Sequence, residues 1–217
     1  MNLWSKIKPP SRDDTWNYVR AWDYTQTNSD DLWSLDPASD GIGEALDLEA
    51  EDPARAFTLL LDLAEQGSVW SMSRVGWCYR AGRGVAQDAT RAEEWSRRAY
   101  EGGSTRALLD YAQMLEQRGQ TEAQEAVYAS GAEMDWAPAS WRLALMRLRR
   151  ARTRQDWLEV RALLERAAEQ GSPAARWLLF KHMARGRFGL REIGRGWRML
   201  KAWCDETLVE MERAGKA

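Results

Sequence analysis

The sequence predicts an all-α protein, a solenoid of antiparallel helix pairs, and three observations predict it. First, one short segment recurs at residues 63–68, 99–104, 131–135 and 167–172, and each copy has a glutamate two residues before a glycine or its replacement. Successive copies are 36, 32 and 36 residues apart, a period typical of stacked supersecondary units. Second, apolar residues within each period recur at helical spacing. Third, glycines and helix-capping residues divide each period into two such stretches.

The composition is that of a globular protein. The 217 residues are 44% hydrophobic and 29% charged, and the chain is long enough to bury a sizeable core. No apolar run approaches the roughly 18 residues that cross a bilayer, and the N-terminus lacks the apolar segment of a signal peptide. We therefore expect a cytoplasmic protein that does not enter the membrane, and Cys78 and Cys204 are compatible with a reducing compartment.

The first part of the chain, residues 1–50, does not follow the repeat. Trp16, Val19 and Trp22 lie on one stripe of a predicted acid-capped amphipathic helix, and residues 34–43 are predicted to form a loop because of their proline and glycines. An open solenoid exposes an apolar face at each end, which a terminal cap must cover. A separate recognition element is the alternative for the N-terminal part. The predicted segments are an N-terminal helical capping segment at 1–50, helical repeats at 51–204 and a C-terminal cap at 205–217.

The clearest helix pair is predicted over residues 71–104. Val75 and Cys78 belong to the apolar stripe of its first helix. Gly82 and Gly84 are expected to end that helix, because glycine adopts left-handed backbone conformations that other residues resist.

The second helix of each pair is predicted from its cap and its apolar stripe. Asp88 is the N-cap candidate of the 71–104 pair, and Asp52, which precedes Pro53, is its counterpart one period earlier. The residues expected to be buried in the second helices are Ala56, Leu59 and Leu63, then Ala92, Trp95 and Ala99, and then Val160, Leu163 and Ala167. A capping box at Thr121 and Gln124 is predicted for the remaining pair.

The 71–104 segment resembles the SLR family of Sel-one-like repeats, which are relatives of the tetratricopeptide repeats. The residues that carry the resemblance are Gly76, Cys78, Tyr79, Gly82, Gly84, Val85, Asp88, Ala92, Trp95 and Gly103. The departures are Asp135, which stands where glycine is usual, and the loop from Gly186 to Gly189. The resemblance implies a right-handed α/α superhelix of bacterial type that acts as an adaptor, scaffold or regulator. An inhibitor or immunity protein that clamps one toxin or enzyme is a narrower alternative.

The sequence gives little support for catalysis. His182 is the only histidine and shares the helix position of Cys78, Met114 and Met146, so we interpret it as a core or semi-core residue. The two cysteines lack the spacing of a zinc site, and the Gly82-Arg-Gly84 turn lacks the lysine of a phosphate loop. We expect no enzymatic activity, no metal and no cofactor.

Charge is distributed unevenly, although the formal net charge is only −2. Residues 1–66 carry 14 acids and 5 bases, a net of −9, whereas residues 142–201 carry 16 bases and 5 acids, a net of +11. These stretches are either solvated helix faces or, for residues 142–201, a surface for an anionic polymer such as nucleic acid. Nucleic acid is the less favoured partner, because the whole chain is not basic and contains no RNA-binding motif.

In the SLR fold, the first helices of the pairs line the concave side. The residues of these helices that lie off the core stripe are predicted to bind a partner, and they are Trp70, Arg74, Trp77, Arg106, Asp110, Gln113, Trp141, Arg142, Arg149, Trp177, Lys181 and Arg185. Trp and Arg are enriched at interface hot spots. We therefore predict a protein-binding module whose Trp/Arg-lined groove holds an acidic or aromatic-containing segment of a protein. The alternative is that Trp141 and Trp177 pack between adjacent repeats.

Overall fold

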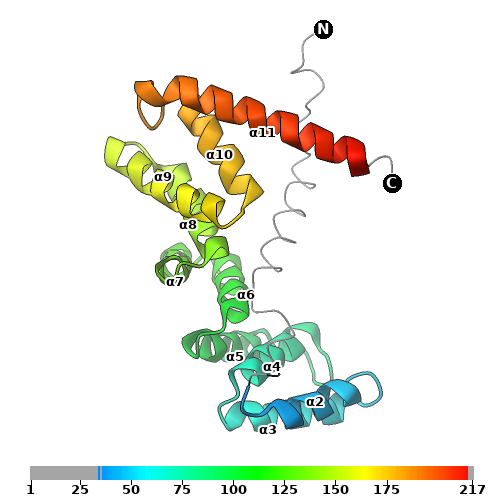
Figure 1. Cartoon of the computed structure of the whole chain (residues 1–217). Coiled ribbons are helices and arrows are strands. Elements are labelled where there is room, and N and C mark those ends of the chain that lie inside the picture. The colour runs from blue at the N-terminus through cyan, green and yellow to red at the C-terminus, as the bar shows by residue number, and fades with distance from the viewer. Residues whose placement is uncertain (1–33, 35, 215–217) are drawn as a thin grey trace. The chain divides into compact units, whose positions relative to one another are not determined.

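The computed structural model describes residues 34 and 36–214, with side chains as far as residue 205 (Figure 1). This described part of the chain is helical and contains no strand. It divides into two compact units, an N-terminal unit that ends at Val127 and a C-terminal unit that begins at Tyr128. The division falls within helix α7 (Thr121–Glu133). The helix predicted around Trp16 lies outside the described residues.

In the N-terminal unit, consecutive helices pack against one another from α2 to α6. These helices are α2 (Ser39–Leu48), α3 (Pro53–Glu65), α4 (Val69–Ala81), α5 (Ala89–Glu101) and α6 (Thr105–Gln117). Their core includes Leu60, Val75, Cys78 and Leu108, all of which are buried. The α4–α5 pair is the one that the sequence predicted most clearly.

In the C-terminal unit, the same helix-by-helix packing continues through the last helix. Its elements after α7 are α8 (Ala137–Arg150), α9 (Arg154–Glu169), α10 (Pro173–Ala184), the short 3-10 helix η3 (Leu190–Glu192) and α11 (Ile193–Ala214). The helices α10 and α11 approach closely at Gly196, where a Cβ atom would lie 2.3 Å from the backbone nitrogen of Ala184. A side chain at this position would force the two helices apart.

The repeated segment forms the turn that leads into the first helix of each pair. Its glycines, Gly67, Gly103 and Gly171, have φ angles of 105°, 94° and 97°, a region that other residues rarely adopt. The serine after each glycine caps the next helix by accepting a hydrogen bond from the backbone N–H three residues later. In the degenerate copy, Asp135 adopts the same kind of turn with a φ of 57°. The turn therefore persists without glycine, as a short polar side chain permits.

The predicted caps and turn of the α4–α5 pair are confirmed. Asp52 and Asp88 accept backbone hydrogen bonds at the start of α3 and α5, and Gly82 ends α4 in the left-handed conformation. Gly84 serves a second purpose, because a Cβ there would lie 2.0 Å from the carbonyl oxygen of Pro53. The α4–α5 loop thus rests directly on the start of α3.

The predicted loop over residues 34–43 is wrong from Ser39 onward, where α2 begins. Ile42 and Ala45 of this helix are completely buried. A Cβ at Gly41 would lie 3.1 Å from the side chain of Leu63. This glycine therefore allows α2 and α3 to pack closely, whereas the sequence analysis took it as a sign of a loop.

Two further details of the helices differ from the prediction. In α3 the buried residues include Leu60 and Ala64, and the predicted Leu59 and Leu63 are only half-buried, because α3 packs against both α2 and α4. The capping box predicted at Thr121 is wrong, because α7 already begins at that residue. A complete capping box caps α9 instead, between Thr153 and Asp156.

Candidate partner-binding surfaces

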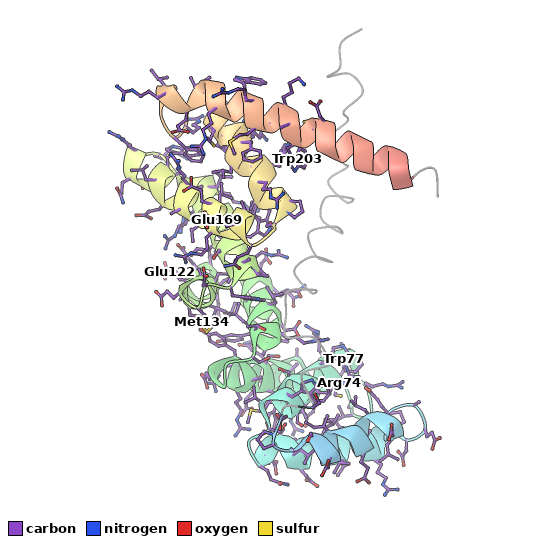
Figure 2. All side chains as sticks on the ribbon, in the orientation of Figure 1. Arg74, Trp77, Glu122, Met134, Glu169 and Trp203 are labelled. Atoms are coloured by element: carbon purple, nitrogen blue, oxygen red, sulfur yellow. The ribbon has the colours of Figure 1, made fainter. Side chains whose placement is uncertain are left out.

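In the N-terminal unit, the first candidate surface lies on α4 and is called the α4 surface. It consists of Trp70, Arg74 and Trp77. All three side chains are half-buried. The guanidinium of Arg74 lies 4.3 Å from the centre of the Trp77 ring, and both residues project from α4 in Figure 2. Arg74 also forms an ion pair with Glu49, just after α2, in which its Nη2 donates to both carboxylate oxygens. The structure therefore brings a Trp and an Arg together, but a carboxylate already neutralises the arginine.

The predicted residues of α6 are Arg106, Asp110 and Gln113, and they differ in accessibility. Asp110 is only 6% exposed, and its Oδ1 accepts a hydrogen bond of 2.7 Å from Nη1 of Arg80. This ion pair connects α4 to α6 and occupies the carboxylate. Arg106 and Gln113 are half-buried.

On α8, the three predicted residues range from buried to exposed. Trp141 is 5% exposed, so its ring is not accessible to a partner in this structure. Its indole N–H has no hydrogen-bond partner among the described residues. Arg142 is half-buried and Arg149 is exposed. Of the α8 set, Arg149 is thus the most accessible residue.

The predicted residues at α10 are Trp177, Lys181 and Arg185, and together they are called the α10 surface. The ammonium nitrogen of Lys181 lies 4.1 Å from the centre of the Trp177 ring. Burial, followed by the nearby charge of Arg185, lowers the pKa of Lys181. Arg185 directly follows the end of the helix and is exposed. This surface repeats the stacked cation and Trp of the α4 surface, with a lysine in place of the arginine.

The sequence analysis missed a cluster of rings beside the α10 surface. The ring of His182 lies 5.3 Å from that of Trp157 on α9 and 6.3 Å from that of Phe188 in the loop after α10. The guanidinium of Arg187 lies 5.0 Å from the centre of the Trp157 ring. His182 is 9% exposed, consistent with its interpretation as a core or semi-core residue. No single repeat contains these contacts, so only the departure of the Gly186–Gly189 loop from the family pattern could have pointed to them.

The titratable side chains of the core do not suggest reactive groups. Burial raises the pKa of the Cys78 thiol to about 11, so the thiol stays protonated and unreactive near neutral pH. Burial, together with the charges of Lys181, Arg185 and Arg187, lowers the pKa of His182 to about 4. Within the described residues, no group of three or more His, Cys, Asp or Glu side chains could hold a metal ion.

The comparisons with known proteins agree with this architecture. The sequence matches the Sel1 repeat family over residues 71–104 and 161–172. The chain is a helical repeat protein that contains Sel1-type repeat sequence in these two stretches. The longer match coincides with α4 and α5, and the shorter one covers the end of α9 and the turn before α10. Sel1 repeat proteins are generally protein-interaction modules and typically non-catalytic.

Two solved structures show the same fold. One is a protective antigen present in uropathogenic Escherichia coli strains and displaying an SLR fold, with a TM-score of 0.63 and 24% identity over 71% of this chain. This chain spans only 34% of the length of that protein. The other is a Sel1 repeat protein from Oxalobacter formigenes, with a TM-score of 0.64 and 20% identity over 75% of this chain and 69% of that one. No curated protein matches the sequence.

The predicted all-α solenoid of helix pairs is thus confirmed by the helices and by these structural neighbours. Among the described residues, no helix is both long and apolar enough to cross a bilayer.

Proposed function

We propose that this SLR-type protein is a non-enzymatic interaction module that binds a protein partner through the first helices of its pairs. The observation that carries the proposal is the pairing of a cation with a half-buried Trp on α4 and again on α10, at positions off the core stripe. Trp and Arg contribute most to interface hot spots, because they bury a large area and make directional contacts. The partner segment that these side chains favour is acidic or contains aromatic residues.

The proposal separates the predicted residues into two groups. The accessible or half-buried ones, such as Trp77, Gln113, Trp177 and Arg185, are proposed to contact the partner. Asp110 and Trp141 support the surface from within, because both are buried. Whether the partner is a pathway component or a toxin that the protein inhibits does not alter the surface proposed.

Site-specific photo-cross-linking tests the proposal. A photoreactive phenylalanine derivative replaces Trp77 or Gln113 in the full chain, and the matched control carries it at Glu94, an exposed position on α5. After irradiation in the cells that express the protein, the α4 and α6 positions are expected to give one discrete protein adduct and Glu94 none. Adducts of equal yield from all three positions, or adducts to nucleic acid alone, would refute the proposed surface.

A further inference from the structure

The end of α10 and the loop after it carry positive charge that the described structure does not neutralise. Lys181, Arg185 and Arg187 lie within seven residues. Among the described residues, no carboxylate lies within ion-pair distance of any of the three. The negative end of the α10 dipole offsets only about half a charge. Most of the charge therefore remains available for a ligand.

The acids of the same region are already engaged or lie elsewhere. Asp156 accepts backbone hydrogen bonds at the start of α9, and Glu159 pairs with Arg147. Glu165 pairs with Arg161, and Glu192 lies within ion-pair distance of both Arg161 and Arg195. The fifth acid of residues 142–201 is Glu169, the last residue of α9 (Figure 2). The helix rises about 18 Å over the twelve residues from Trp157 to Glu169. Among the residues whose side chains the structure describes, no acid compensates the three cations.

Aromatic rings hold two of these three cations in place. Lys181 lies on the Trp177 ring and Arg187 on the Trp157 ring, at 4.1 Å and 5.0 Å from the ring centres. Such contacts restrict a long side chain without neutralising its charge. A ligand that binds here does not have to order the two side chains again, which lowers the entropic cost of association.

A largely exposed apolar side chain follows the cations closely in the sequence. Leu190, in η3, is 82% exposed, and it lies only three residues after Arg187. On α9, Leu158 is 41% exposed and follows Trp157 directly. Large apolar side chains this exposed, beside uncompensated cations, are characteristic of a surface that a partner covers.

We infer that Lys181, Arg185, Arg187 and Leu190 form a docking site for an acidic protein segment that carries an apolar side chain between its carboxylates. The carboxylates bind the three cations, and the apolar side chain packs on Leu190. This inference rests on the proposed function and locates its main contact in the C-terminal unit. It also adds Arg187 and Leu190, which the sequence analysis did not select.

The apolar contact favours a protein segment over nucleic acid, because the phosphate backbone offers nothing to bury an exposed leucine. The inference assigns the docked segment to another protein. Residues 21–33 of this chain carry three acids and no base, so occupation of the site by this stretch is an outcome that would overturn the assignment.

Fluorescence anisotropy of the full chain with a short labelled peptide of alternating glutamate and leucine tests the inference. Substitution of all the glutamates by glutamine, or the double variant R185E/R187E, is expected to weaken binding by at least about tenfold. Leu190→Ala is expected to weaken binding by roughly threefold to tenfold, because it removes a small apolar contact. Leu190 is exposed in the free protein, so this variant is expected to keep its unfolding midpoint.

The matched control is R55E/R176E, which changes the net charge equally at two exposed arginines without a carboxylate partner in the described structure. The control is expected to bind the peptide like the wild type. The inference would be overturned if R185E/R187E bound the peptide as the wild type does, or if the control lost as much affinity for the peptide. It would also be overturned if only oligothymidylate, and no unlabelled acidic peptide, displaced the labelled peptide, or if the protein self-associated and R185E/R187E abolished that self-association. If the peptide did not bind but Trp77 still cross-linked to a partner, this site would be rejected and the proposed function would be retained.

Discussion

The helices α4 and α10 are the first helices of two repeats, yet their charged side chains differ in whether they form ion pairs. On α4, Arg74 pairs with Glu49, and Arg80 pairs with the buried Asp110. On α10, Lys181 lies on the Trp177 ring and has no carboxylate partner in the described part of the chain, and Arg185 adds to the positive charge around it. Ion pairs inside a unit fix its helices, whereas charges without partners cost stability and are available to a ligand. The ion-paired arginines of α4 therefore stabilise the fold, whereas the cations at the end of α10 keep their charge available.

The loops that follow the two helices differ in the same sense. After α4, Gly84 lets the loop rest on Pro53 of the preceding helix. The corresponding register position after α10 is Phe188, which contacts His182 and Trp157 instead. The first loop thus fixes one repeat to its neighbour, and the second contributes a ring to the cationic end of α10.

The largest expected effect is that of Gly84→Ala, which breaks the contact between the α4–α5 loop and α3. The new Cβ would overlap the carbonyl oxygen of Pro53, and the residue must also hold a φ of 72°. We expect the free energy of unfolding to fall by at least about 3 kcal/mol, measured by urea denaturation.

The control for this prediction is Gly82→Ala, because Gly82 has a φ of 71° and its nearest neighbour would lie 3.6 Å from the new Cβ. This variant is expected to lower the free energy of unfolding by about 1 kcal/mol, because only the left-handed backbone conformation disfavours alanine there. Equal losses for the two variants would show that the loop does not depend on the contact with Pro53.

Acid is expected to lower the free energy of unfolding by a smaller amount. Its histidine contribution comes from the C-terminal unit, because His182, the only histidine, lies there. Its pKa is about 4 in the folded protein, below the ordinary 6.5. As the pH falls below 6.5, His182 becomes protonated in the unfolded chain but stays neutral in the folded protein. The free energy of unfolding therefore decreases between pH 6.5 and 4. The shift corresponds to a loss of about 3 kcal/mol at most.

The variant His182→Phe separates this contribution from the titration of the carboxylates. A phenylalanine preserves the ring contacts with Trp157 and Phe188 and cannot bind a proton. Urea midpoints of the variant are expected to fall less steeply than those of the wild type between pH 6.5 and 4. Parallel profiles would mean that the folded protein protonates His182 as easily as the unfolded chain does.

These differences between α4 and α10 were only partly predictable from the sequence. The helix pairs and their aspartate caps follow from local patterns, and these predictions are confirmed at Asp52 and Asp88. Glycine is ambiguous, because Gly41 marks close packing of two helices and Gly82 marks a turn. Only the distances between helices distinguish the two cases.

The candidate surfaces were harder to predict, since a helical period gives the face on which a residue lies but not its partners. Trp141 and Trp177 share a register position, yet one is buried and the other half-buried. The pairing of Arg80 with Asp110 and the ring contacts of His182 join residues on different elements. Such contacts depend on the packing of neighbouring helices, which the repeat pattern does not encode.

The smallest expected effects come from removing one charge on each helix system, and they test the comparison directly. Asp110→Asn leaves Arg80 without its carboxylate, but the arginine side chain is 36% exposed and water can solvate it. We therefore expect a loss of about 1–2 kcal/mol in the free energy of unfolding. Lys181→Met keeps an unbranched apolar side chain on Trp177 and removes a charge that burial and Arg185 disfavour. It is expected to change the free energy of unfolding by no more than about 0.5 kcal/mol. If Lys181→Met proved as costly as Asp110→Asn in urea denaturation, the ammonium would contribute to the fold as the ion pairs of α4 do, and the comparison between the charges of the two helices would fail.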